Sequence, residues 1–200
     1  AAGAITLRYT ASGSPYKNDM IVYMNNRLAE APGRSLDESK DAGISVYLCM
    51  YLALSSGELR IQSTDPSQPP ALDYNYLQDP LDRSRYREGI RLCADLFKQA
   101  EFNDLVEERL APSDDILASD EALDLWVKQQ VRTAHHICGT AKMGPFTDPL
   151  AVVDQYGQVY GIEGLRIVDA STMPHCVRAN LNATVMAMAE GIADFIKQGH

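Results

Sequence analysis

The sequence predicts an α+β protein, and three observations lead to this fold class. Within residues 1–133, short segments in which apolar and polar residues alternate come first, and segments with helical spacing follow them. Residues 134–200 hold short β-type runs separated by glycines and then a final helix. With 200 residues, 46% of them hydrophobic and 22% charged, the chain has the composition of a globular protein that can bury a core.

Charge and cysteine content exclude several classes of protein. The net charge of -9, with no run of Lys and Arg, argues against a nucleic-acid partner or an anionic membrane surface. No stretch approaches the roughly 18 apolar residues of a membrane span, so no membrane partner is evident. Four cysteines occur without any Cys-x-x-Cys spacing: Cys49, Cys93, Cys138 and Cys176. This scatter indicates neither a disulfide framework nor a metal site, and reduced thiols favour the cytoplasm in a chain whose compartment is otherwise unknown.

Strands are expected early in the chain. The ranges that alternate or are rich in β-formers are 5–11, 20–24, 44–54 and 58–62. Periodicity in 44–54 also fits a core helix, but its β-formers favour a strand. The turn at Ser55-Ser56-Gly57 predicts that 44–54 and 58–62 form a hairpin, with Leu59 and Ile61 facing inward. Loops are expected over 31–42 and 65–80, where prolines, glycines and charges gather.

Three helices are expected, each with a polar residue at its start. Asp82 is the predicted N-cap of the first, whose apolar face is Tyr86, Ile90, Cys93, Phe97 and Ala100. Ser119 is the predicted N-cap of the second, whose apolar face is Leu123, Trp126, Val127 and Val131. Asn182 is the predicted N-cap of a helix from Ala183 toward Lys197, with a buried stripe of Val185, Met188, Ala189, Ile192 and Ile196.

Three polar groups between residues 135 and 184 are the candidate functional residues. The first is the pair His135-His136 followed by Gly139-Thr140, where a histidine can act as an acid or base and a glycine lets a flat ligand approach the backbone. The second is Asp169-Ala170-Ser171 at the end of a β-type run, and the third is Asn180 to Thr184 at a helix start. Each also has an ordinary structural interpretation: a solvated histidine, a strand-end carboxylate and an N-cap asparagine.

Taken together and in this order, the motifs resemble the C-terminal signature of the glucose–methanol–choline (GMC) family of FAD-dependent oxidoreductases. The matching runs are His136 to Thr140 with Met143-Gly144, Val153-Asp154, Gly161, Gly164 to Ser171, Met173-Pro174, Asn180 to Thr184 and Ala189-Glu190. The match extends back through Gly57 to Arg60, Asp65-Pro66, Asn75 to Leu77, Asp79-Pro80 and Arg87 to Arg91, so it covers nearly the whole chain and is strongest from Gly57 onward. The sequence departs from the family at Ile137 and Leu181, where many members carry proline.

The resemblance implies a domain organisation. Residues 1–133 would be a portion of an antiparallel-sheet substrate-binding domain with helices, and 134–200 a segment that completes an FAD-binding α/β domain. The family's Gly-x-Gly-x-x-Gly loop, which holds the FAD pyrophosphate at a helix N-terminus, does not occur in these residues. We therefore expect the chain to be the C-terminal part of a longer enzyme, to need the missing N-terminal FAD-binding part, and to be inactive alone with weak or no binding of FAD.

The resemblance also implies site residues. His136 would be the general base that takes the hydroxyl proton of a small-molecule alcohol, and Asn180 would hydrogen-bond the substrate oxygen while a hydride leaves for the flavin. Contacts to FAD would come from His135, Asp169, Ala170, Leu181, Asn182, Ala183 and Thr184. His135 would either contact the flavin through its backbone or support His136 from behind. Two other functions remain open: an FAD-containing hydroxynitrile lyase, and a catalytically silent binding or structural module.

Overall fold

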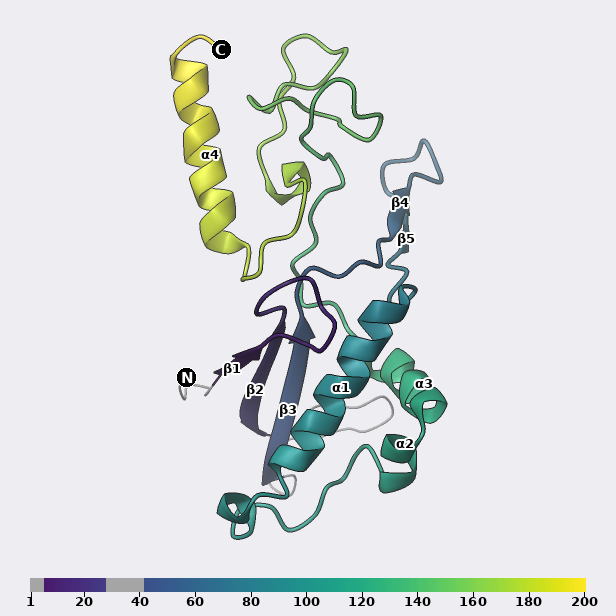
Figure 1. Cartoon of the computed structure of the whole chain (residues 1–200). Coiled ribbons are helices and arrows are strands. Elements are labelled where there is room, and N and C mark those ends of the chain that lie inside the picture. Colours follow the sequence, from purple (N-terminus) through teal and green to yellow (C-terminus); the bar gives the residue numbers. More distant parts are fainter. Residues whose placement is uncertain (1–5, 28–41) are drawn as a thin grey trace. The chain divides into compact units, whose positions relative to one another are not determined.

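The structure is a computed structural model that describes residues 6–27 and 42–200 (Figure 1). The chain divides into two compact units. Unit 1 holds the described residues up to Gly57 and Tyr74–Arg132, and unit 2 holds Glu58–Asp73 and Thr133–His200. The segment Glu58–Asp73 therefore belongs to the second unit, whereas the sequence placed it in the first domain. Most of the loop expected over 31–42 lies outside the described residues.

Unit 1 contains an antiparallel sheet of three strands in the order β1-β2-β3. These are β1 (Thr6–Tyr9), β2 (Met20–Arg27) and β3 (Ala42–Met50), which confirm three of the predicted strands. Tyr23 on β2 faces Tyr47 on β3, and their rings stack at 5.1 Å between centroids. Met20 and Val22 are buried, so β2 forms the centre of this sheet both in pairing and in packing.

The predicted hairpin between β3 and the next strand is wrong. Strand β4 (Glu58–Arg60) pairs instead with β5 (Ala71–Asp73), which lies in the stretch predicted to be loop, and β3 pairs with β2. Leu59 is 47% exposed and Ile61 is 82% exposed, so neither faces a core as predicted. A two-stranded ribbon has too little apolar surface to bury its own side chains, and alternation alone does not reveal this.

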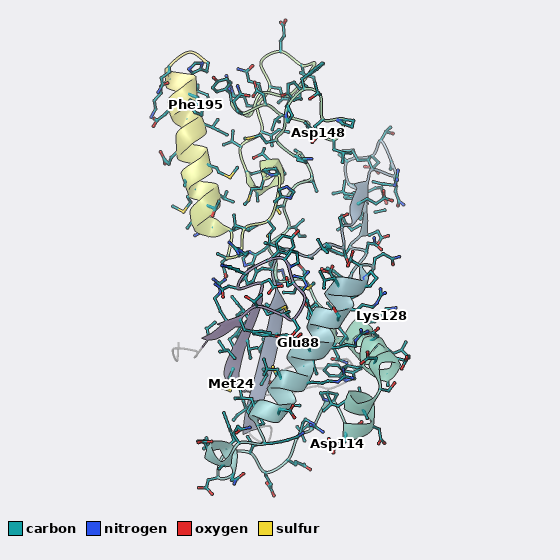
Figure 2. All side chains as sticks on the ribbon, viewed as in Figure 1. Met24, Glu88, Asp114, Lys128, Asp148 and Phe195 are labelled. Atoms are coloured by element: carbon teal, nitrogen blue, oxygen red, sulfur yellow. The ribbon has the colours of Figure 1, made fainter. Side chains whose placement is uncertain are left out.

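Helix α1 (Pro80–Leu96) packs on the sheet and carries a polar buried face. Its N-cap is Asp79, not Asp82, because the Asp79 side chain accepts a hydrogen bond from Leu81 N and Pro80 fixes the first helical residue. Gly89 lies against the sheet: a Cβ at this position would stand 2.6 Å from Leu48 Cδ2 and from the Tyr9 hydroxyl. The absence of a side chain at Gly89 thus allows the helix to approach the strands closely. Glu88, labelled in Figure 2, projects from the same helix and accepts a hydrogen bond of 2.9 Å from Ser12 N.

Helices α2 (Asp114–Ala118) and α3 (Asp120–Gln130) follow a 3-10 turn, η1 (Ala100–Phe102). Ser119 caps α3 by accepting from Ala122 N at 3.2 Å, as predicted. Leu123 and Val127 are buried with Leu77, and the partly buried apolar residues packed against them are Tyr86, Ile90, Ile116, Leu117, Trp126 and Val131. The predicted apolar face of α3 therefore lies in this core, but of the face predicted for the first helix only Tyr86 and Ile90 reach it, since α1 ends at Leu96. The ion pair of Arg87 with Asp124, 2.9 Å long, also joins α1 to α3.

A fully buried arginine joins three segments of unit 1. The Arg85 guanidinium on α1 is completely buried and donates to the carboxylates of Asp19 at 2.9 Å and Asp82 at 2.5 Å. It also donates to the backbone carbonyls of Tyr51 at 3.3 Å and Leu52 at 3.1 Å. A planar guanidinium has several donors in fixed directions, so one side chain holds the end of β3, the start of β2 and the first turn of α1 together.

The two buried carboxylates are stabilised in their charged form. Burial by itself raises the pKa of a carboxyl group, but hydrogen bonds from Ser14, Arg85 and the Ala11 N–H together lower the pKa of Asp19. Burial likewise opposes ionisation of Asp82, and hydrogen bonds from Ser55, Leu54 N and Arg85 lower its pKa. Both carboxylates therefore remain ionised in the folded chain below the pH at which they would gain a proton in the unfolded chain.

Unit 2 consists of the β4–β5 ribbon, a long coil, the 3-10 turn η2 (Ala170–Thr172) and the final helix α4 (Asn182–Lys197). The predicted runs near 152, 159 and 165 form isolated bridges, not strands: Met143 with Val153, Val153 with Val159, and Gln158 with Arg166. Of the predicted stripe on α4, only Ile192 is buried, while Ile196 is 50% exposed. In the part of the chain that the structure describes, no helix is both long and apolar enough to cross a membrane.

We expect Arg85→Met to lower the free energy of unfolding by about 3–5 kcal/mol, because Asp19 and Asp82 would stay buried without their cation. Denaturant unfolding of the chain at pH 7 measures this. The control is Arg60→Met, which removes an exposed ion pair with Glu58 and should change stability little.

The pH dependence gives a second measurement on the same variant. The lowered pKa values of Asp19 and Asp82 stabilise the native chain above the unfolded pKa of about 4, and this contribution is lost as pH falls through the folded pKa. In Arg85→Met the deficit relative to the native chain should shrink as pH falls below about 4. A deficit that is independent of pH would mean that Arg85 acts only through packing.

A matched pair of glycines tests the coil of unit 2. Gly157 and Gly161 have nearly the same positive φ, 72° and 77°, but a Cβ on Gly157 would stand 2.8 Å from the Ile167 carbonyl oxygen, whereas nothing lies within 4 Å of one on Gly161. Gly161→Ala should cost about 1 kcal/mol for the left-handed backbone alone. Gly157→Ala should cost about 1–3 kcal/mol more, as measured by unfolding, and equal costs would contradict the close approach.

Candidate active site

Two of the three polar motifs lie side by side in unit 2. Gly139 N donates to the Ala170 carbonyl at 3.3 Å, Ala141 N to that of Ser171 at 2.9 Å, and Met143 N to the Thr172 carbonyl at 2.9 Å. Three backbone hydrogen bonds at alternate donor residues therefore align the segment after the histidine pair with the segment after Asp169. The structure thus brings the end of the first motif, from Gly139 onward, against the second motif.

Gly139 permits the closest approach between these segments. It has φ of +85°, a conformation that residues with a Cβ rarely adopt, and a Cβ at this position would stand 3.4 Å from the Met173 carbonyl oxygen. The glycine of the histidine motif is thus required by the local backbone. This is a structural reason for the residue in addition to the access for a flat ligand that the sequence suggested.

The two histidines differ in their surroundings. His135 is exposed, has φ of +61°, and its backbone N–H donates to the Thr133 hydroxyl at 3.0 Å. His136 is half-buried, and its backbone carbonyl lies 3.9 Å from the sulfur of Cys176, which acts as the donor. The left-handed turn at His135 lies directly before His136, and the paired segment begins three residues later at Gly139.

Asp169 has a definite local role. Its Oδ1 accepts a hydrogen bond from Ser171 N at 2.7 Å and another from the Ser171 hydroxyl. Asp169 is thereby the N-cap of the 3-10 turn η2. The carbonyl of Ala170 is the acceptor for Gly139 N. Both predicted cofactor residues thus take part in holding the turn that lies beside the histidine segment, and the carboxylate of Asp169 remains exposed to solvent.

The third motif forms the start of α4, with one correction to the sequence analysis. Asn182 is the first residue of the helix and not its N-cap; Leu181 holds that position, and its apolar side chain gives the helix no hydrogen bond. Leu181 is buried, whereas Asn180 and the first two helical residues are exposed. The backbone N–H groups of Asn182, Ala183 and Thr184 belong to the first turn and point out of the helix end, where they favour an electron-rich partner.

One pair of residues at the site was not singled out from the sequence. The thiols of Cys138 and Cys176 influence each other's pKa, although 38 positions separate them in the chain. The hydrogen bond from Cys138 lowers the pKa of Cys176 to about 7. The same contact, followed by burial, raises the pKa of Cys138. Each cysteine lies within five residues of one of the polar motifs, but a distance in sequence cannot reveal that the two thiols interact.

A short turn closes the coil after the histidine segment. Asp148, labelled in Figure 2, forms an ion pair of 2.6 Å with Lys142 and accepts from Leu150 N. The Tyr160 hydroxyl donates to the Gly144 carbonyl at 2.8 Å. These contacts hold the Lys142–Gly144 stretch of the motif in place, so its lysine is engaged in structure.

The arrangement fits a flat, partly anionic ligand. The chain supplies a half-buried imidazole at His136, a backbone turn at Ala170 and an uncapped helix end at α4. An electron-rich ring edge is stabilised at a helix N-terminus. In the described residues no group of three or more His, Cys, Asp or Glu side chains could hold a metal ion.

Comparison with known proteins shows which family the chain resembles. A family model described as GMC oxidoreductase matches residues 53–189. The chain is 42% identical over 155 residues to the oxygen-dependent choline dehydrogenase of Proteus mirabilis, covering 78% of this chain and 27% of that protein. Pyridoxine 4-oxidase from Mesorbium loti superposes with a TM-score of 0.81 at 26% identity, covering 98% of this chain and 38% of that chain.

A third comparison concerns a flavoprotein. A formate oxidase of Aspergillus oryzae, whose structure was solved to study FAD modification, superposes with a TM-score of 0.79 at 29% identity, covering 92% of this chain and 32% of that chain. The chain thus spans about a quarter to two fifths of the length of these relatives. Because the family model covers more than half of the residues, including all three polar motifs, this chain belongs to the GMC oxidoreductase family.

Proposed function

We propose that this chain is the C-terminal part of an FAD-dependent oxidoreductase that removes a proton and a hydride from an alcohol. The observation that carries the proposal is the backbone pairing of residues 139–143 with 170–172, which fixes the segment of His136 beside the turn that begins at Asp169. This pairing lies within the range that matches the family model. A pair of histidines alone would be weak support for this reaction. A histidine whose segment is held beside the turn that we assign to the cofactor supports it better.

In this proposal His136 takes the proton of the substrate hydroxyl. Its half-buried imidazole is a nitrogen base, and Gly139 and Cys176 anchor its segment from either side. Asn180 donates a hydrogen bond to the substrate oxygen as negative charge develops there. Such a hydrogen bond lowers the activation free energy most when the donor is already in position. Asn180 precedes α4 by two residues, so the helix start fixes its backbone.

FAD is the cofactor that we assign to this site, and when bound it supplies the redox chemistry. The N–H groups at the start of α4 would face its electron-rich ring edge, and Leu181 would pack beneath it. The turn at Asp169 and Ala170 would contact the ribityl and phosphate portion, and His135 would contribute through its backbone. The phosphate-binding loop would come from an N-terminal part of the same enzyme, in keeping with a match to 27% of the choline dehydrogenase of Proteus mirabilis.

The proposal is tested by anaerobic mixing of the full-length enzyme with alcohols, with flavin absorbance as the readout. Choline is the first substrate to try, since relatives about 42% identical carry the name choline dehydrogenase. Bleaching of the flavin supports alcohol oxidation. Release of cyanide from a cyanohydrin without bleaching would show a lyase instead, and the absence of any flavin in the full-length protein would show a silent module.

We expect His136→Ala in the full-length enzyme to lower kcat by about 10²–10⁴-fold, the usual contribution of a general base, while FAD stays bound. Steady-state turnover and flavin absorbance measure the two effects. His175→Ala is the control, because His175 is an exposed histidine in the same unit and has no proposed role. Turnover that survives nearly intact in His136→Ala would show that another group is the base.

Asn180 is tested by two substitutions with opposite expectations. Asn180→Ala removes the donor to the developing oxyanion and should lower kcat by about 10²-fold, with a smaller effect on KM. Asn180→His keeps a donor at this position and should restore most of the rate. Equal losses in both variants, measured by steady-state kinetics, would indicate that the residue serves the loop structure and not the substrate.

A further inference from the structure

The ribbon of β4 and β5 presents one apolar side to solvent. Leu59 and Leu72 are cross-strand partners in its register, so their side chains project from the same side of the ribbon. They are 47% and 55% exposed. Ile61, directly after β4, is 82% exposed, the largest value for any large apolar side chain that the structure describes. The proposed reaction uses none of these three residues.

The opposite side of the ribbon is polar. Glu58 and Arg60 flank Leu59 in β4, so their side chains project the other way. The Arg60 guanidinium donates to both carboxylate oxygens of Glu58, at 2.8 and 2.7 Å, and both side chains are more than half exposed. An antiparallel ribbon with one polar and one apolar side is typical of a sheet that faces water on one side and packs against protein on the other.

Local hydrogen bonds hold the ribbon in shape at both ends. At its base, the Asn75 side chain donates to the Ser56 carbonyl at 3.0 Å and so joins the chain before β4 to the chain after β5. In the loop between the strands, the Asp65 carboxylate accepts from Ser67 N at 2.9 Å, and Asp65 N donates to the Ser63 hydroxyl at 3.0 Å. Because the ribbon is already ordered, a surface that docks on it has less conformational entropy to offset.

The small size of the apolar side indicates which kind of partner covers it. A stable complex between separate proteins buries about 800 Å² on each partner. Three aliphatic side chains supply only a fraction of that area, so a second copy or another free protein gains too little from them to offset the freedom lost on association. A segment of the same polypeptide is tethered near the ribbon and needs far less contact area to stay docked.

We propose that the apolar side of the β4–β5 ribbon docks on an apolar surface of an N-terminal part of the same polypeptide. The inference rests on the proposed function in one respect, that this chain belongs to a longer enzyme. The match covers 27% of the choline dehydrogenase of Proteus mirabilis and 38% of the pyridoxine 4-oxidase chain, so most of each relative lies outside it. Leu59, Ile61 and Leu72 form the docking surface, and Glu58 and Arg60 stay in solvent.

The first test compares two thiols introduced one at a time into the full-length enzyme, by Leu72→Cys on the apolar side and by Glu58→Cys on the polar side. A soluble maleimide should label the Leu72→Cys thiol at least about tenfold more slowly than the Glu58→Cys thiol, because access limits its reaction. Peptide mapping measures both rates, and labelling in urea corrects for intrinsic reactivity. Unchanged flavin content shows that each variant folds. Equal rates in the native enzyme would overturn the proposal.

The second test identifies what covers the ribbon. The full-length enzyme is produced with a photoreactive leucine analogue, as a mixture of isotope-labelled and unlabelled polypeptides, and illuminated. We expect cross-links from Leu59 and Leu72 to residues N-terminal to Ala1 within one polypeptide. Cross-links that join labelled to unlabelled polypeptides would show a second copy on the ribbon and overturn the proposal. Cross-links that reach only residues 1–200 would overturn it as well.

Both measurements are independent of turnover, so a failure of the docking can be told from a failure of the proposed reaction. An enzyme whose flavin bleaches with an alcohol, but whose Leu72→Cys thiol is labelled as fast as the Glu58→Cys thiol, would contradict the docking alone. Slow labelling of the Leu72→Cys thiol in an enzyme that no alcohol reduces would support the docking and contradict the reaction alone.

Discussion

The backbone pairing of residues 139–143 with 170–172 is the interaction on which the candidate site depends. Unit 2 has few strands of its own, so this pairing replaces a sheet as the frame for the polar motifs. It works because Gly139 adopts a positive φ and because Asp169 caps the turn that presents the opposite acceptors. Asp169 and Ala170, which the sequence analysis expected to contact the cofactor, therefore also hold the backbone of the candidate site together.

Unit 1 relies on a different physical device. Its helices and sheet meet through a small apolar core around Leu123, and through the buried cation of Arg85 with two carboxylates. Such a buried cluster contributes little net stability compared with an apolar core, yet it is costly to break in part. It therefore fixes which ends of β2, β3 and α1 lie together. The close contact at Gly89 acts in the same direction by setting the distance from α1 to the sheet.

The sequence alone determined the class of the fold, the strands of the first sheet, the Ser119 cap and the ordered polar motifs, because each depends on residues close in the chain. It could not determine that β4 pairs with β5, because this pairing depends on which strand is nearest in space. The helix starts were misplaced by a few residues for local reasons: Asp79 caps α1 because Pro80 takes the first helical position, and Leu181 holds the N-cap position of α4. Tertiary structure also decided the burial of Arg85, since contacts between distant residues leave no local pattern.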